Sequence, residues 1–297
     1  MPTHHHHGRP KGVGSFTELP DPSSLKAWEH VFLEEGVRED LLRRVVFTMR
    51  NRGRLTGMRS GLQGMALFAG PPGTGKSTTA RIIASKAAAA LAEEGTSSLV
   101  RINPHALPSS SLGESQQNVK ELLGSVLQEY AQRTRFVFVI IDEVESFAVR
   151  RSAASFETNP VDVHRATDAV LEGLDELLLA EPFIYVLMTT NFPDAVDEAV
   201  ISRVDDVVEF ALPTPQQIAA ILRDTLEEYG QIWPKLAGLA ADERALLEIA
   251  ERCEGLAGRS LRKLVLSAVL QRQETTDDPG LLTADDFHRA LRKYSER

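Results

Sequence analysis

The sequence has very little cysteine: Cys253 is the only one in 297 residues. An intrachain disulfide is therefore impossible, and a reducing compartment suits such a chain best. Long apolar runs are missing too, since the richest stretch, Leu177 to Met188, contains Glu181 and Pro182 and is shorter than the ~18 residues that a membrane span needs. The N-terminus is polar and lacks the apolar core of a signal peptide, so we expect a soluble, cytoplasmic protein with no membrane partner.

An excess of positive charge is also absent. Lys and Arg number 33 against 42 Asp and Glu, which gives a formal net charge of −9. Proteins that hold nucleic-acid phosphates usually carry a basic surface, so nucleic acid is an unfavoured partner. Hydrophobic residues make up 42% and charged residues 25%, which excludes a chain disordered throughout, a collagen-like repeat and a coiled-coil rod.

Composition divides the chain into three parts. Residues 1–24 contain four consecutive histidines with several prolines and glycines, and are predicted to form a flexible tail. Residues 25–211 alternate short apolar runs with amphipathic helices, which predicts a large α/β domain with a parallel sheet covered by helices on both faces. After Pro213 only helical patterns follow, so residues 212–297 are predicted to form a small all-helical domain.

Five short apolar runs are predicted to be the strands of the sheet. They lie at residues 65–69, 99–102, 136–141, 183–189 and 206–210. The run at 136–141 is apolar throughout, as expected for a parallel strand that is buried on both faces. Helices are predicted at 25–49, 77–94, 119–130 and 163–179 in the first domain, and at 215–229, 242–253, 259–273 and 283–295 in the second.

A phosphate-binding loop follows the first predicted strand. The segment from Gly70 to Ser77 reads GPPGTGKS and fits the pattern G-x-x-x-x-G-K-[ST]. Small residues let the backbone wrap a triphosphate with its N–H groups turned inward, and the helix that starts here adds the positive end of its dipole. Lys76 is expected to reach the β- and γ-phosphates, and the Ser77 hydroxyl to ligate Mg²⁺. The predicted nucleotide-binding residues of the loop are Pro72, Gly73, Thr74, Gly75, Lys76, Ser77 and Thr78.

Two carboxylates end the apolar run at 136–141. Asp142 is expected to hold Mg²⁺ through water, and Glu143 to orient and deprotonate the attacking water. Acidic residues at the end of a buried strand are difficult to explain as ordinary surface charge, because ligands bind at this edge of a parallel sheet. The sequence therefore predicts an ATPase that uses ATP and Mg²⁺.

With an all-helical domain behind them, these motifs resemble the AAA+ superfamily of ring ATPases. The resemblance implies that the helical domain is a lid and that Asn191, after the predicted strand 183–189, is the sensor-1 residue that polarises the lytic water. It also implies that Arg203 is an arginine finger acting on the γ-phosphate of a neighbouring subunit. Many members carry two arginines here, three residues apart, whereas this chain has Val200 at the first position and so offers one finger.

Two further nucleotide contacts are implied by the same resemblance. Arg259, at the start of a basic helix, corresponds to the sensor-2 residue, and Val31 lies in the segment that usually packs over the adenine. Asn191 and Arg259 also have plainer interpretations. Asn191 could be a turn former, and Arg259 could be a surface arginine.

Three segments narrow the resemblance to the pachytene-checkpoint branch of AAA+ remodellers. They are residues 102–107 (INPHAL), 142–146 (DEVES) and 255–264 (GLAGRSLRKL). Enzymes of this branch pull on the N-terminus of HORMA-domain proteins and convert them between closed and open states. The resemblance therefore implies a homo-oligomer, expected to be a hexameric ring, with a HORMA-domain protein as its substrate. Short bacterial relatives accompany HORMA proteins and cyclic-oligonucleotide synthases in anti-phage defence, and this chain resembles them in length.

The pore segment departs from the usual pattern. Ser111, Leu112 and Gly113 occupy the position of pore loop 1, where many translocases present an aromatic residue. Ser111 stands at the aromatic position, so Leu112 is the apolar residue expected to grip the substrate, unless the segment is only a serine-rich surface loop. Two other functions stay open: a nucleic-acid-associated ATPase of the clamp-loader or initiator type, and a slow-turnover scaffold that uses ATP as an assembly switch.

Overall fold

The computed structural model of the chain describes residues 10, 12–31, 33, 36–55, 61–103, 121–146 and 160–295. It divides into two compact units. The first contains the chain up to Gly70 and residues Lys76–Glu209, and the second contains Pro71–Gly75 and Phe210–Arg297. Apart from residues 71–75, the second unit starts at Phe210, and the predicted boundary between residues 211 and 212 stays a prediction.

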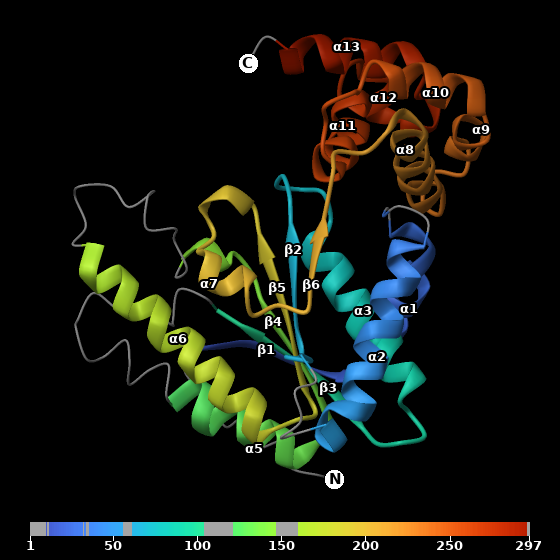
Figure 1. The fold of residues 1–297 in the computed structure, drawn as a ribbon. Helices are drawn as coiled ribbons and strands as arrows, with labels where there is room; N and C mark the ends of the chain where they lie inside the picture. The colour runs from blue at the N-terminus through green and yellow to red at the C-terminus, as the bar shows by residue number, and fades with distance from the viewer. Residues whose placement is uncertain are drawn as a thin grey trace. The chain divides into compact units, whose positions relative to one another are not determined.

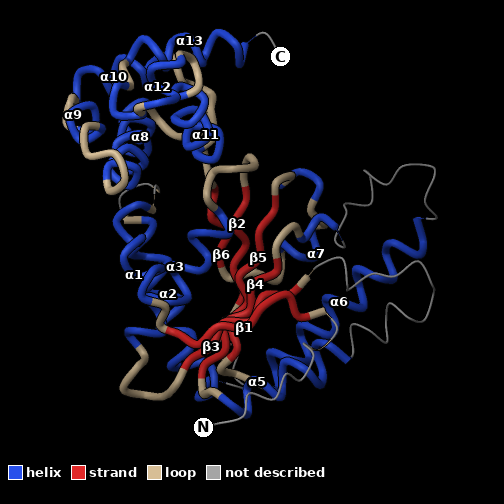
Figure 2. Tube along the Cα trace, turned by 180° about the vertical axis from the view of Figure 1, so that it is seen from behind, coloured by secondary structure: helices blue, strands red, loops and turns tan. Residues whose placement is uncertain are grey.

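A six-stranded sheet forms the centre of the first unit, with its strands in the spatial order β1-β3-β4-β5-β2-β6 (Figures 1 and 2). The inner strands pair in parallel, and the predicted parallel α/β fold is confirmed. The predicted strands are all present, with small shifts at their ends. Their bounds are β2 Met65–Ala69, β3 Ser97–Ile102, β4 Phe136–Ile141, β5 Ile184–Thr190 and β6 Asp206–Glu209.

The strand β1 (Val13–Leu19) was not predicted, and the expectation of a flexible tail is wrong for this part of the chain. It pairs antiparallel with β3, so that Phe16 lies opposite Val100, and the Phe16 ring stacks on Tyr130 with 5.0 Å between ring centroids. The helix α1 (Pro22–Lys26) follows it. The partners of β1 are distant in the sequence, and for that reason the local composition of the tail did not reveal the strand.

Helices cover both faces of the sheet (Figure 1). On one face lie a π-helical turn (Leu122–Val126), α5 (Leu127–Arg133) and α6 (Pro160–Ala180), whose apolar side chains form a single buried cluster with those of the strands. On the other face lie α2 (Val37–Leu55) and α3 (Lys76–Ala90). The predicted helix at 119–130 therefore contains a π-helical segment, which its i, i+3, i+4 pattern did not distinguish from an α-helix.

The predicted helix at 25–49 is interrupted. After α1 the chain forms a 3₁₀ turn (Ala27–His30), and α2 starts only at Val37, next to Gly36 with its φ of +87°. Glycine adopts this left-handed conformation without a steric penalty, so the chain can change direction here. Shorter elements of the first unit are the 3₁₀ turns Val144–Ser146 and Pro193–Ala195 and the helix α7 (Glu198–Ile201).

From Pro215 on, the regular elements of the second unit are all helices in its described part. Its first helix begins with a capping box, in which the Thr214 hydroxyl accepts from the Gln217 N–H and the Gln217 side chain accepts from the Thr214 N–H. The helices are α8 (Pro215–Gly230), α9 (Leu236–Ala240), α10 (Glu243–Glu251), α11 (Gly258–Val269), α12 (Gln273–Asp277) and α13 (Ala284–Ser295). The short helices α9 and α12 were not predicted, because five residues do not establish a period. None of the helices in the described part of the chain has the length and apolar character of a membrane span.

Candidate nucleotide site

The predicted phosphate loop connects β2 to α3. Gly73 and Gly75 have φ angles of +81° and +101°, which residues with a side chain rarely adopt. Gly73 is also closely packed: a Cβ atom there would lie 3.2 Å from the Ala257 Cβ and 3.3 Å from the Arg259 Cβ. The Arg259 N–H donates a hydrogen bond of 3.2 Å to the Gly73 carbonyl. The loop therefore needs glycine for its conformation and for the close approach of α11.

Lys76 opens α3 and is 5% exposed. Its ammonium group donates a hydrogen bond of 2.6 Å to the Gly70 carbonyl, so the positive charge is held against the main chain of the loop. A buried ammonium group requires such partners, because burial of an unpaired charge is costly. The ammonium group of Lys76 is thus fixed at the start of α3, where a phosphate-binding lysine is predicted to lie.

Ser77 and Asp142 come together across the sheet. The Ser77 hydroxyl donates to Asp142 Oδ1 at 2.5 Å, and the Thr189 hydroxyl donates to the same oxygen at 3.1 Å. The three residues lie at or beside the carboxyl ends of β2, β4 and β5, which are neighbours in the sheet. Strand order therefore brings together residues that the sequence separates, at the edge where α/β sheets bind ligands.

Arg101 on β3 is the charged partner of Asp142. Its Nη2 lies 2.6 Å from Asp142 Oδ2. Burial by itself raises the pKa of the Asp142 carboxyl, but hydrogen bonds from Ser77, Arg101 and Thr189 outweigh it and hold the pKa below its usual value. Asp142 is therefore an ionised carboxylate at neutral pH.

Glu143 is exposed and has a φ of +56°, the single positive φ of a non-glycine residue in the described ranges. Its N–H donates to the Thr189 hydroxyl at 3.3 Å, which holds the turn that directs the chain away from β4. Non-glycine residues in this conformation carry a steric cost and concentrate at functional sites. An exposed carboxylate directly after the ionised Asp142 can accept a proton from a water molecule.

Asn191 is connected to the same acidic segment. Its N–H donates to Glu145 Oε1 at 3.1 Å, while Glu145 Oε2 is buried without a hydrogen-bond partner in the described residues. Glu145 thus fixes the backbone of the predicted sensor residue at the end of β5. The contact joins the 3₁₀ turn after β4 to the turn after β5.

Arg203 stands apart from this cluster. Its Nε donates to Asp175 Oδ2 of α6 at 2.9 Å, and its Nη1 donates to the Ala199 carbonyl at 3.0 Å. Within the described residues, Arg203 forms no hydrogen bond with Asp142 or Glu143. The role of Arg203 at the site of a neighbouring subunit stays a prediction.

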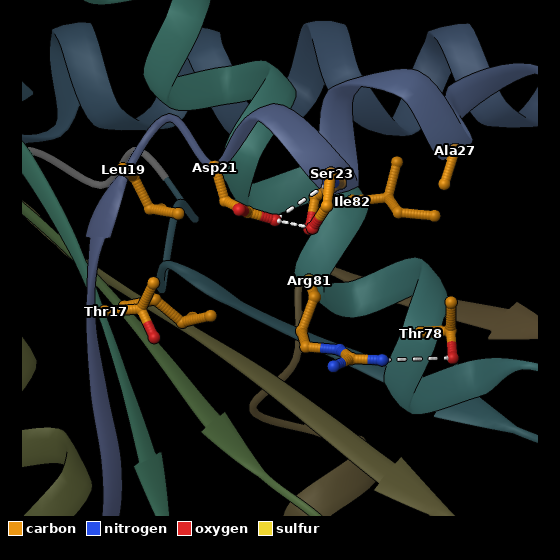
Figure 3. A pocket seen from close by; sticks show the side chains of 10 residues that line it. Thr17, Leu19, Asp21, Ser23, Ala27, Thr78, Arg81 and Ile82 are labelled. Atoms are coloured by element: carbon orange, nitrogen blue, oxygen red, sulfur yellow. Dashed lines mark hydrogen bonds between the residues drawn. The ribbon is translucent and has the colours of Figure 1, made fainter.

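Thr78 faces a different hollow. A pocket of about 350 Å³ opens beside the first turn of α3, between β1 and α1 (Figure 3). Arg81 donates to the Thr78 hydroxyl at 3.4 Å on one side, and Asp21 accepts from the Ser24 N–H at 2.8 Å on the other. Of the residues predicted to bind nucleotide, Thr78 alone is among those that line this pocket.

Two further predicted nucleotide contacts lie in or beside other helical elements. Val31 follows the 3₁₀ turn after α1 and is 7% exposed, and Arg259 is exposed in the first turn of α11. Both stay predictions as nucleotide contacts. The predicted pore residues Ser111, Leu112 and Gly113 lie outside the described residues.

The oxygen atoms of Ser77 and Asp142 fit Mg²⁺. Magnesium binds hard oxygen ligands and usually takes one or two from the protein, with the rest supplied by water and substrate phosphates. No group of three or more acidic, histidine or cysteine side chains forms a metal cage in the described part of the chain. One hydroxyl and one carboxylate within hydrogen-bond distance are what such a phosphate-assisted site requires.

Sequence reasoning did not identify four residues that hold the predicted site residues in place. They are Arg101, Glu145, Asp175 and Thr189. Glu145 and Thr189 lie inside motifs that were recognised, so their proximity to the site was a usable signal. Arg101 and Asp175 carry no local signal, because each is an ordinary charged residue until strand order and helix packing give it a partner.

Comparison with known proteins places this geometry in context. Residues 66–212 match the family described as "ATPase family associated with various cellular activities (AAA)". CD-NTase-associated protein 6 of Pseudomonas aeruginosa is 35% identical over 287 residues, covering 97% of this chain and 93% of that protein. The pachytene checkpoint protein 2 homolog of Danio rerio is 31% identical, covering 90% of this chain and 68% of that protein.

Solved structures with the same fold include PCH-2 of C. elegans, with a TM-score of 0.77 and 22% identity over 97% of this chain and 78% of that one. A chain of the E. coli MS115-1 HORMA:CdnC:Trip13 complex has a TM-score of 0.74 and 19% identity, covering 95% of both chains. At these identities the likeness concerns the fold alone.

Proposed function

This chain belongs to the AAA family of ATPases, in the group of CD-NTase-associated protein 6 and pachytene checkpoint protein 2, and from that premise we propose that it uses ATP to remodel a HORMA-domain protein. The chain is an ATPase by its family. The nature of its protein substrate, its metal ion and its assembly are the parts that we propose.

One observation carries the proposed chemistry: the Ser77 hydroxyl meets the ionised Asp142 while Glu143 stands exposed beside it. When bound, Mg²⁺ would be held by the Ser77 hydroxyl and, through water, by Asp142, and would neutralise charge that develops on the phosphates. Lys76 contributes a fixed positive charge at the start of α3. The N–H groups of the first turn of a helix also favour an anion at this end.

Hydrolysis requires a base for the attacking water. We assign this role to Glu143, whose carboxylate is exposed and whose backbone is fixed by Thr189. Asn191 is proposed to orient the same water, and its backbone is anchored by Glu145. Arg203 is proposed to complete the site of a neighbouring subunit, which requires a closed ring; we propose a homohexamer.

The substrate assignment rests on whole-length similarity. CD-NTase-associated protein 6 matches this chain over 93% of its own length, and the E. coli complex with the same fold contains a HORMA protein and CdnC. We therefore propose a HORMA-domain partner and a role in anti-phage signalling by cyclic oligonucleotides. Leu112, with Ser111 and Gly113, is proposed to contact the substrate in the central pore.

The test is an ATP-dependent capture. Glu143→Gln protein would be immobilised with ATP and exposed to lysate of the source cell, and retained proteins would be identified by mass spectrometry. A HORMA-fold protein retained with ATP and lost with ADP supports the proposal, provided that this HORMA-fold protein, once purified, also binds Glu143→Gln protein. The control is Lys76→Ala protein, which should not bind ATP and should retain nothing.

Two results would contradict the assignment. If nucleic acid or clamp components are retained and are washed off by moderate salt, the chain is an ATPase of the clamp-loader or initiator type. If wild-type protein hydrolyses ATP slowly and its turnover is unchanged by the HORMA protein, the chain is an ATP-switched scaffold. In both cases the chain still belongs to the AAA family of ATPases, and the proposed remodelling of a HORMA-domain protein is wrong.

A further inference from the structure

Arg101 is a charged residue within the otherwise largely buried strand β3. It lies in β3 opposite Ile140 of β4 and Ser15 of β1, and its neighbours Val100 and Ile102 are 0% and 4% exposed. The guanidinium reaches past the end of β4 to Asp142, where Nη2 lies 2.6 Å from Oδ2. Arg101 itself is 42% exposed at its side chain, whereas that of Asp142 is 19% exposed.

Both oxygens of the Asp142 carboxylate accept hydrogen bonds. Oδ1 accepts hydrogen bonds from Ser77 and Thr189, both neutral hydroxyls, and Oδ2 accepts from Arg101. The arginine therefore supplies a positive charge directly on the carboxylate that is assigned to magnesium. A charge-assisted hydrogen bond of this length is stronger than one between neutral groups.

We propose that Arg101 sets the magnesium affinity of the site, lowering it so that the metal binds as a complex with nucleotide and not to the protein alone. The proposal rests on the nucleotide site proposed above. A guanidinium and a divalent cation compete for the negative charge of the same carboxylate, and a fixed positive charge repels a cation bound nearby. Phosphate oxygens and water then have to supply most of the oxygen atoms that coordinate the metal ion.

The charges around Asp142 show why such an arginine has an effect. Glu143 follows directly and is exposed, and Glu145 lies in the next turn with one oxygen bound to Asn191. Without Arg101, the end of β4 would present these carboxylates without the ion pair that Asp142 makes with the arginine. A cluster of acidic groups with little compensation attracts divalent cations even when no nucleotide is bound.

The experiment measures metal binding directly. Mn²⁺, which takes the same oxygen ligands as Mg²⁺, would be titrated into Arg101→Gln and wild-type protein, with and without saturating ADP, and free Mn²⁺ read by electron paramagnetic resonance. The expected result is a dissociation constant lower by about tenfold in Arg101→Gln, in both conditions. Arg133→Gln is the matched control, because it removes an exposed arginine whose partners, Glu129 at 3.6 Å and the ring of Tyr130 at 5.5 Å, both lie in its own helix. It should bind Mn²⁺ as wild type does.

Two further variants keep the proposal falsifiable. Arg101→Met retains the apolar stem and replaces Arg101→Gln if the latter fails to fold, and Arg101→Lys retains the charge and should keep an affinity near that of wild type. Unchanged or weaker Mn²⁺ binding by the neutral variants overturns the proposal. Weaker binding of metal-free ADP by them also overturns it, since Arg101 would then contact phosphate. If wild-type protein binds no ADP at all, the failure lies in the proposed nucleotide site and not in Arg101.

Discussion

Arg203 Nε lies 2.9 Å from Asp175 Oδ2, so the predicted arginine finger is held by α6 of its own subunit. A second bond from Nη1 to the Ala199 carbonyl fixes the plane of the guanidinium, and Nη2 makes no hydrogen bond within the described residues. A planar guanidinium held at two nitrogens has little rotational freedom left. Nη2 is therefore the nitrogen that we expect to contact a phosphate on a neighbouring subunit.

This arrangement predicts that Asp175 positions Arg203. Arg203→Ala should lower kcat by about 10³-fold, as loss of an arginine finger does, and Asp175→Asn by about tenfold, because the arginine stays but loses its orientation. The effects should not add in the double variant, since Asp175 acts through Arg203. Glu176→Gln, an exposed neighbour in α6, is the control and should leave kcat unchanged. Full activity of Arg203→Ala would remove its assignment as a finger.

Loss of the proposed base is the second prediction. Glu143→Gln should retain ATP binding and assembly and should lower kcat by about 10²- to 10⁴-fold, because a neutral amide cannot accept a proton. Turnover is measured as phosphate release, and binding by fluorescence of a labelled ATP analogue. Glu172→Gln, an exposed residue of α6, is the matched control. Substantial hydrolysis by Glu143→Gln would show that another group activates the water.

A third prediction concerns the phosphate loop. Gly73→Ala adds a Cβ 3.2 Å from Ala257 to a residue whose φ is +81°, so we expect ATP binding to weaken by about tenfold or more. Gly238→Ala is the control, because this glycine lies in α9 with nothing within 4 Å of the added atom. The control should bind ATP normally and be slightly more stable. Equal binding by both variants would mean that the loop tolerates a side chain.

The fourth prediction concerns the stability of the second unit. Asp286 is fully buried and accepts hydrogen bonds from Arg272 Nε at 2.6 Å and from the Thr283 N–H at 3.0 Å. Asp286→Asn should lower the free energy of unfolding by about 2 kcal/mol at pH 7. Asp285→Asn, whose partner Arg289 is exposed, should change it by less than about 0.5 kcal/mol. Denaturant unfolding of the full chain measures both.

The effect of Asp286→Asn should depend on pH in a defined direction. Burial raises the pKa of Asp286, but hydrogen bonds from Arg272 and Thr283 outweigh it and hold the pKa below its usual value of 3.8. The unfolded chain therefore takes up the proton at higher pH than the folded one. The stabilisation by Asp286 is complete above about pH 4 to 5 and is lost as the pH falls through the folded pKa. A difference between wild type and variant that grows on acidification would contradict this assignment.

Several features of the site could be predicted from sequence because neighbouring residues carry them. The spacing of Gly70, Lys76 and Ser77 defines a loop between a strand and a helix, and Asp142 follows an apolar run that only a buried strand explains. Periodicity likewise predicted the helices of the second unit that have a cap or several turns, such as α8 with its capping box.

Other features were decided only when the chain folded. The edge strand β1 forms because it pairs with β3 and packs on Tyr130. The residues of a strand do not by themselves show which strand it pairs with. The π-helical turn before α5 and the break before α2 are also tertiary outcomes. Local patterns report which face of an element is apolar but not which element covers it.

By itself the sequence determined which residues are predicted to carry the chemistry: a lysine and a serine after a glycine-rich loop, and two carboxylates after a buried strand. The tertiary structure decided which charges restrain them. Arg101 meets Asp142 because β3 and β4 are neighbours, and Asp175 meets Arg203 because α6 packs beside the end of α7. Ion pairs of this kind depend on distances of a few ångströms between segments far apart in the chain, and only the packed fold sets those distances.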